Sequence, residues 1–309
     1  MDRILKVGMV GLDTSHCEAF TRLLNDPADP HHIPGAKVVA GFPGATADWP
    51  VSNDRVAGFT ATLRDKYNVE ILDCPEAVAD AVDMLMITSV DGRRHREFLQ
   101  RTIAAGKPTF VDKPFALCED DAQAMLDLAR EHSIPLMSSS ALRYADPFAA
   151  ALNDDSQGAI VGIDAYGPMA LQPQAPGVFW YGCHSFEMIV AAMGVGCSHI
   201  EAQVDDKVDL HVMTWSDGRR ATFRGLRTGA NPFGATLHRE NGFQQIDIRT
   251  CQRPFYVSLL EAVVRSLPHG HSDVPAEQML EVVRVMQHAN VARDTGEPVA
   301  LAAPAPAGV

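Results

Sequence analysis

The stretch "VGMVGLDTSHCEAF", Val7 to Phe20, joins a short apolar run to a segment with helical spacing through a turn at Gly11. An apolar run of this length is typical of a strand buried on both faces of a parallel sheet. A strand, a glycine turn and a helix in this order favour a phosphate site at the helix N-terminus. Such turns usually carry further glycines, and Asp13 and His16 stand in their places here. The stretch therefore predicts a nucleotide-binding fold with an altered turn.

The first half of the chain repeats this alternation about five times. Apolar runs at residues 4–10, 37–42, 69–72, 82–89, 108–112 and 134–139 are separated by helical spacing at 14–24, 55–67, 94–105 and 119–132. Strands and helices that alternate in this way make a doubly wound parallel sheet with right-handed crossovers. We therefore expect an α/β, Rossmann-type domain over residues 1–143.

The alternation of strands and helices ends after residue 143. Strand-like runs follow one another at 159–166, 200–204, 208–215, 220–226 and 244–248, and helical segments close the chain at 256–267 and 276–293. The segment "WSDGRRATF" predicts a hairpin with Asp217 and Gly218 at its tip. Residues 144–302 are therefore predicted to form an α+β domain with a largely antiparallel open sheet, and 303–309 a flexible tail.

The composition restricts the partners. A chain of 309 residues suits two domains, and a net charge of −13 argues against nucleic acid or an anionic membrane as a partner. The 6 cysteines contain no CxxC pair, which indicates free thiols in a reducing compartment. The sequence has no run of about 20 apolar residues that could span a bilayer. We expect a cytoplasmic protein that binds a small molecule.

Three stretches together resemble the Gfo/Idh/MocA oxidoreductases, which are sugar and cyclitol dehydrogenases with an N-terminal Rossmann domain. They are "AAGKPTFVDKPFA" (104–116), "MITSVDGRRHREF" (86–98) and the closing segment that runs from "LLEAVVRSLPHG" to "DTGEPVAL" (259–301). The resemblance implies a nicotinamide cofactor, NAD or NADP, together with a hydroxylated substrate such as a sugar or polyol. It also implies a homodimer or homotetramer.

The same resemblance implies the catalytic positions. The lysine of the family's EKP motif falls on Lys113, beside the reacting carbon. The segment "WYGCHSFE" (180–187) is similar to the family's DxGxHxxD segment, so that His184 takes the position of the general base. Glu187 replaces the last aspartate and Trp180 replaces the first. One acidic neighbour of the base is therefore missing.

The cofactor positions depart further from the family pattern. The glycine fingerprint falls on Gly11, Asp13 and His16, and a carboxylate about 4–5 Å from the phosphates costs on the order of 1–4 kcal/mol. The second strand ends in "AGFPGA", with no acid for the ribose before Asp48. The residues implied in cofactor binding are Gly11, Asp13, Thr14, Ser15, His16, Ser89, His95 and Asp112.

Several of these residues have two interpretations. Asp13 or Thr14 either caps the helix that follows, or the helix start binds an anion through Thr14 and Ser15 while His16 faces the crevice. Lys113 is either a solvated surface lysine or a crevice residue that polarises a substrate oxygen.

His184 is either a buried core histidine or the base that removes a hydroxyl proton, oriented by Glu187 three residues on. His95 either caps its helix or approaches the nicotinamide, and capping is the favoured interpretation. Trp180 and Tyr181 form either a sugar-stacking wall or ordinary packing. Arg143 and Tyr144, at the domain junction, are candidates for substrate contact.

The leading hypothesis is an NAD(P)-dependent oxidoreductase in which His184 takes the hydroxyl proton and Lys113 steadies the oxygen. The alternative is a lyase, epimerase or hydrolase that has lost dinucleotide binding and uses Asp13, His16, Lys113 and His184 directly. A third hypothesis is a non-catalytic ligand-binding relative. The ligand types of Asp13, His16, His184 and Glu187 suit a metal, but no HxxxH spacing supports one, and we expect none.

Overall fold

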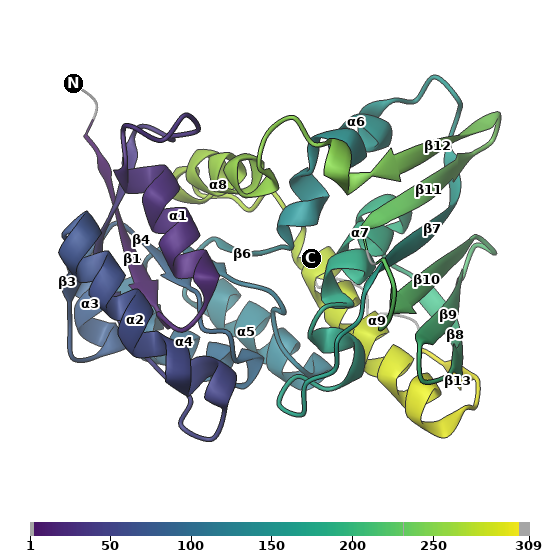
Figure 1. Ribbon diagram of the computed structural model, residues 1–309, viewed down its shortest axis with the longest axis horizontal. Helices are drawn as coiled ribbons and strands as arrows, with labels where there is room; N and C mark the ends of the chain where they lie inside the picture. Colours follow the sequence, from purple (N-terminus) through teal and green to yellow (C-terminus); the bar gives the residue numbers. More distant parts are fainter. Residues whose placement is uncertain (1–2, 231, 303–309) are drawn as a thin grey trace. The chain divides into compact units, whose positions relative to one another are not determined.

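The computed structural model describes residues 3–230 and 232–302. The chain clusters into two compact units (Figure 1). The first unit contains the described residues up to 116 together with 120–139 and 256–276, and the second contains the rest. Residues 256–276, which the sequence analysis assigned to the second domain, thus belong to the first unit. The tail predicted at 303–309 lies outside the described residues.

The first unit holds a 6-stranded parallel sheet in the order β3-β2-β1-β4-β5-β6. The predicted doubly wound sheet is confirmed. Its strands are β1 (Leu5–Val10), β2 (Ala36–Phe42), β3 (Glu70–Ile71), β4 (Met84–Ile87), β5 (Thr109–Val111) and β6 (Leu136–Ser138). Its helices are α1 (Ser15–Asn25), α2 (Pro50–Tyr67), α3 (Pro75–Ala81), α4 (His95–Thr102), α5 (Glu119–Glu131) and α8 (Phe255–Ser266), of which α5 and α8 start at residues of the second unit.

The strand order places the candidate site. The chain leaves β1 toward β2 and β3 on one side, and returns to pair β4 on the other side of β1. Ligands of open α/β sheets bind outside the carboxyl ends of the strands at such a reversal of strand order. The turns that follow β1, β4 and β5 are therefore the parts of this unit from which a site is built.

Two helices differ from the sequence prediction. Helix α2 starts at Pro50 rather than near Arg55, because proline suits the first turn of a helix. Helix α3 was not predicted, since 7 residues are too few to show a clear helical period. The methyl groups of Val78 on α3 approach β1 so closely that a Cβ at Gly8 would lie 2.6 Å from Val78 Cγ1.

The second unit holds a 7-stranded sheet in the order β12-β11-β7-β10-β9-β8-β13, in which β7 and β10 are parallel and the other neighbours antiparallel. The predicted α+β class is confirmed. The strands are β7 (Ile160–Pro168), β8 (Cys197–Val204), β9 (Val208–Trp215), β10 (Arg220–Leu226), β11 (Gly234–Arg239), β12 (Gly242–Asp247) and β13 (Val299–Ala300). The helices are α6 (Asp146–Asn153), α7 (Cys183–Met193) and α9 (Ala276–Thr295), the last starting at a residue of the first unit.

One face of this sheet is covered by α7, which packs on β7 and β10 (Figure 1). Alternate residues of β9 are buried, as a strand with one covered face requires. The predicted hairpin between β9 and β10 is confirmed, with Gly218 at a φ of 90° in its turn. Helix α6 and strand β11 were not predicted.

Candidate functional site

The turn after β1 lies very close to the backbone at the ends of the neighbouring strands β2 and β4. Gly11 has a φ of 91°, and a Cβ there would lie 2.5 Å from the backbone nitrogen of Ser89, so a side chain is excluded. The amide of Gly11 donates to Phe42 O at 2.9 Å, and the amide of Leu12 donates to Pro43 O at 2.7 Å. The first glycine of the turn is therefore required by the close approach of β1 and β4.

Asp13 points into the protein. Its carboxylate accepts hydrogen bonds from Ser52 Oγ at 2.5 Å and from the Val90 amide at 2.8 Å, and Ser89 Oγ lies 3.4 Å away. The side chain is fully buried, and burial raises its pKa despite the hydrogen bonds from Ser52 and Val90. Of the two residues expected to cap the helix, Asp13 does not, because its partners lie on α2 and after β4, whereas Thr14 is the N-cap residue. The carboxylate therefore does not lie at the surface of the turn.

The start of α1 is formed by the next two residues. Thr14 is the N-cap residue, and its Oγ1 lies 3.5 Å from the His16 amide. Ser15, the first residue of the helix, is exposed, whereas Thr14 and His16 are buried. The helix N-terminus therefore carries an exposed serine, and the amides of His16 and Cys17 are bonded to Thr14.

Both ring nitrogens of His16 have partners within the first unit. Its Nδ1 lies 2.5 Å from Asp112 Oδ2 and its Nε2 lies 2.8 Å from the hydroxyl of Tyr256. Asp112 follows β5, and Tyr256 lies in the first turn of α8. Three segments of the first unit thus meet at the imidazole.

Ser89 and His95 form hydrogen bonds that hold the loop after β4 in place. The ring of His95 is fully buried, with Nε2 2.8 Å from Ser89 O and Nδ1 3.1 Å from Phe115 O. His95 is the first residue of α4 and its side chain does not cap the helix, so the capping interpretation is wrong. It ties the end of β4 to the segment after β5.

Lys113 follows Asp112 directly. Its backbone amide donates to Asp112 Oδ1 at 2.8 Å, and the peptide bond to Pro114 is cis. Its side chain is half-buried. The position is therefore at the carboxyl end of β5.

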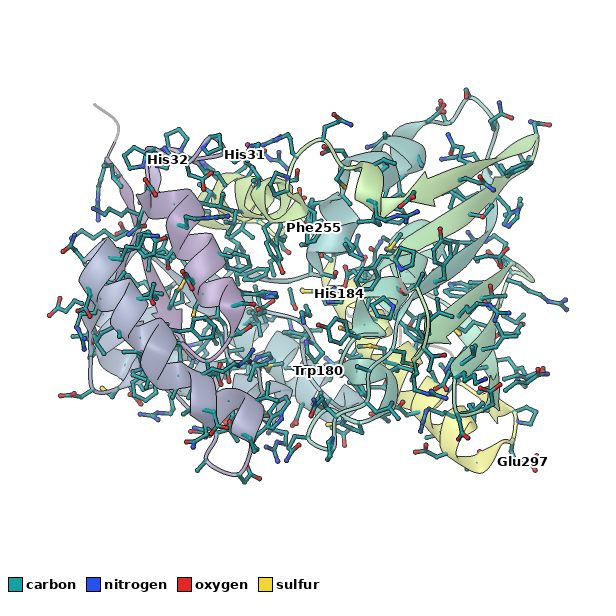
Figure 2. The ribbon with its side chains drawn as sticks, viewed as in Figure 1. His31, His32, Trp180, His184, Phe255 and Glu297 are labelled. Carbon is teal, nitrogen blue, oxygen red and sulfur yellow. The ribbon has the colours of Figure 1, made fainter. Side chains whose placement is uncertain are left out.

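In the second unit, His184 projects from the first turn of α7 (Figure 2). Its Nδ1 lies 2.7 Å from Ser140 Oγ, and its ring packs edge-on against Phe233 at 5.2 Å. Tyr181 lies one turn earlier, and its ring contacts those of Trp180 and His184 at 5.8 and 6.2 Å. The half-buried imidazole is thus held by a hydroxyl among aromatic rings.

Glu187 and Arg143 form a buried ion pair. Arg143 Nε donates to Glu187 Oε1 at 2.6 Å, and Arg143 Nη2 donates to Gln278 at 2.9 Å. Glu187 was expected to orient His184, and one oxygen of its carboxylate accepts this hydrogen bond from the guanidinium of Arg143. Tyr144 ends the short helical turn that carries Arg143 and is half-buried.

Three partners of the candidate site residues were not predicted from the sequence. Ser52, Ser140 and Tyr256 bind Asp13, His184 and His16, respectively, from positions 39, 44 and 240 residues away. A serine or tyrosine carries no local signal of such a long-range contact. Within residues 3–230 and 232–302, no group of three or more His, Cys, Asp and Glu side chains is placed to hold a metal ion. That part of the chain also has no helix long and apolar enough to cross a membrane.

Together, the strand order and the turn at Gly11 define a protein with a doubly wound α/β domain. Residues 51–140 match the family model GFO_IDH_MocA, described as "Oxidoreductase family, NAD-binding Rossmann fold". The resemblance of this chain to the Gfo/Idh/MocA oxidoreductases is thus confirmed. No curated protein matches the chain.

Solved structures cover nearly the whole chain. The myo-inositol 2-dehydrogenase from Lactobacillus plantarum has a TM-score of 0.79 at 16% identity, covering 97% of this chain and 100% of its own. The myo-inositol dehydrogenase from Lactobacillus casei, in complex with NAD(H) and myo-inositol, has a TM-score of 0.78 at 15% identity, with 98% of each chain covered. GenD2 from gentamicin A biosynthesis, in complex with NAD, has a TM-score of 0.76 at 16% identity, covering 98% of this chain and 97% of its own. At identities of 15% and 16%, the similarity to these structures establishes the fold of this chain and nothing further.

The residues of the turn fit a phosphate group at the start of α1. Thr14 caps the helix, Ser15 is exposed, and the Asp13 carboxylate is turned away into hydrogen bonds with Ser52 and Val90. A helix N-terminus of this kind binds anions through its free amides and its dipole. The repulsion expected between Asp13 and a phosphate is therefore reduced by the orientation of its side chain.

Proposed function

We propose that this protein is an NAD(P)-dependent oxidoreductase that acts on a sugar, polyol or related hydroxy compound. The observation that supports it most directly is the start of α1, where a capped helix N-terminus follows β1 at the reversal of strand order. The family match and the inositol dehydrogenases of similar fold, crystallised with NAD(H), support the same proposal.

The catalytic residues of the proposed reaction are Lys113 and His184. When bound, the nicotinamide would supply the acceptor for a hydride from the carbon that bears the substrate hydroxyl. Lys113, at the carboxyl end of β5, donates a hydrogen bond to the substrate oxygen and stabilises the negative charge that develops on it. His184 accepts the hydroxyl proton, with its ring oriented by Ser140.

Cofactor binding is the first test. We expect NADH or NADPH to bind with a Kd below about 1 mM, which corresponds to about −4 kcal/mol, in isothermal titration calorimetry. Oxidation of a panel of cyclitols, sugars and polyols is then followed by NADH absorbance. Failure of both cofactors to bind at millimolar concentration would exclude the proposal.

A lyase, epimerase or hydrolase on the same scaffold is the second candidate. It is favoured by one observation, the buried hydrogen bonds of Asp13 and His16 where the family has open glycine backbone. This candidate requires that neither cofactor binds and that His16→Ala abolishes whatever activity is found.

The quaternary structure is proposed from the resemblance alone. We expect a homodimer or homotetramer. Light scattering coupled to size-exclusion chromatography measures the molar mass, and a mass near 33.5 kDa would show a monomer and contradict this proposal.

A further inference from the structure

The contacts of His16 form a continuous chain of hydrogen bonds within the first unit. The Asp112 carboxylate lies 2.5 Å from Nδ1 of the imidazole, and the Tyr256 hydroxyl lies 2.8 Å from Nε2. A carboxylate, an imidazole and a hydroxyl in this order match the general arrangement of an orienting acid, a base and an activated hydroxyl. The third group here is a phenol rather than a serine.

The surroundings of Asp112 favour its ionised, carboxylate form. Burial opposes its ionisation, but the interactions with His16 and then Lys113 outweigh burial and lower its pKa. Its Oδ1 accepts the backbone amide of Lys113 at 2.8 Å, and its Oδ2 is directed at His16. Because a carboxylate can only accept hydrogen bonds, it fixes a proton on Nδ1 and leaves Nε2 for the phenol.

The surroundings of the imidazole are aromatic. The ring of Phe20 is stacked on His16 at 5.4 Å, and Phe20 also contacts the ring of Tyr256 at 5.5 Å and that of Phe110 at 6.5 Å. The exposed fraction is 9% for His16 and 3% for Asp112, whereas Tyr256 is half-buried. Tyr256 is thus the most exposed of these three residues.

We propose that Asp112, His16 and Tyr256 form an acid–base triad in which the Tyr256 hydroxyl exchanges protons with a ligand that carries a hydroxyl or carbonyl oxygen. The triad lies beyond the carboxyl ends of β1 and β5, at the edge of the sheet where open α/β folds bind their ligands. This inference goes beyond the proposed dehydrogenase function, because the proton transfer needs no nicotinamide.

The proposed step is a double proton transfer. The ligand hydroxyl gives its proton to the Tyr256 oxygen as the phenolic proton moves to His16 Nε2. One O–H bond breaks on the ligand, one breaks and one forms on Tyr256, and one N–H bond forms on His16. The ligand is left as an alkoxide, and the imidazolium faces the Asp112 carboxylate. The reverse transfer protonates the alkoxide.

Packing alone does not account for this chain. If this position in the core between α1, β5 and α8 served only to hold the three segments together, an apolar side chain would fill it more favourably. The reason is that burying charged partners carries a desolvation penalty. The activated hydroxyl makes a chemical prediction that a structural contact does not, namely enhanced nucleophilicity at neutral pH.

The test measures this nucleophilicity with phenylmethanesulfonyl fluoride, and so needs no knowledge of the ligand. The Tyr256 oxygen forms a bond to sulfur, the S–F bond breaks with release of fluoride, and the phenolic proton passes to His16. Peptide mass spectrometry follows the rate of modification. Tyr166, which is also half-buried but lies in the second unit, is the internal control.

We expect Tyr256 to react at least about 10-fold faster than Tyr166 in the wild type, and Asp112→Asn to remove most of this advantage. His16→Gln is the second variant, and melting curves check that each variant is folded. Equal rates for Tyr256 and Tyr166 in the wild type would overturn the proposal, whatever the variants do. A fast rate that persists in folded Asp112→Asn and His16→Gln would overturn it as well. Cofactor titration is a separate measurement, so the two proposals can fail independently.

Discussion

The Oγ atom of Ser140 lies 2.7 Å from Nδ1 of His184, and this contact fixes the plane of the imidazole at the start of α7. If His184 is the base, His184→Asn should lower turnover by about 100-fold or more and Ser140→Ala by about 10-fold, because general base catalysis depends on the placement of the ring. Steady-state kinetics with the cofactor and a responsive polyol measure both effects. Normal turnover per folded molecule, together with a lower melting temperature, would identify His184 as a core histidine.

Lys113→Ala should lower turnover by about 100-fold with little change in melting temperature, since the side chain is half-buried and its role is electrostatic. Lys37→Ala, at an exposed position of β2, is the matched control and should leave kcat unchanged. A Lys113→Ala variant with full activity would remove this residue from the mechanism.

Glu187→Gln should destabilise the second unit by about 3–5 kcal/mol, because it leaves the Arg143 guanidinium buried without its charged partner. Asp127→Asn breaks an exposed ion pair with Arg130 and should cost no more than about 1 kcal/mol. Urea denaturation of both variants gives the comparison. Equal losses would show that the buried pair has no special role in stability.

Asp13→Gly should lower stability rather than improve cofactor affinity. The change removes the acceptor for Ser52 Oγ and the Val90 amide, and an unsatisfied buried donor costs about 1–3 kcal/mol. Because the carboxylate is turned away from α1, the Kd for NADH should change by less than about 3-fold. An improvement of about 10-fold would mean that the carboxylate does repel the phosphates.

His211 makes stability depend on pH. Burial lowers its pKa to about 4, and within the described residues its ring nitrogens have no hydrogen-bond partner. Between about pH 6.5, the unfolded value, and pH 4, the unfolded chain binds the proton and the folded chain does not. Stability is therefore fully present above pH 6.5 and falls as the pH drops, by up to about 3 kcal/mol. The difference between wild type and His211→Leu in urea denaturation should show this slope, and a constant difference would contradict it.

Much of the fold could be predicted, because each parallel strand is a short apolar run and each long helix shows its period. What local pattern could not show is a 7-residue helix such as α3, or the return of residues 256–276 to the first unit. The first lacks enough turns to establish a period, and the second depends on which surface the helix buries.

The hydrogen-bond partners of the candidate site residues could not be predicted from the sequence. The sequence identified Asp13 and His16 as departures from the family pattern and named Asp112 among the cofactor positions. It did not show that His16 and Asp112 bind each other across 96 residues. Hydrogen bonds of this kind form when the strand ends are brought together, so their partners are set by topology rather than by neighbouring residues.

The division of the chain into units also limits how the protein can be dissected. The first unit is completed by residues 256–276, which are synthesised after most of the second unit. A fragment that stops at residue 139 would lack α8, including buried Val257, Leu260 and Val263, and would also lack Tyr256. Neither unit can therefore be obtained by a single truncation. Producing the first unit alone would require residues 256–276 to be rejoined to it by a new linker.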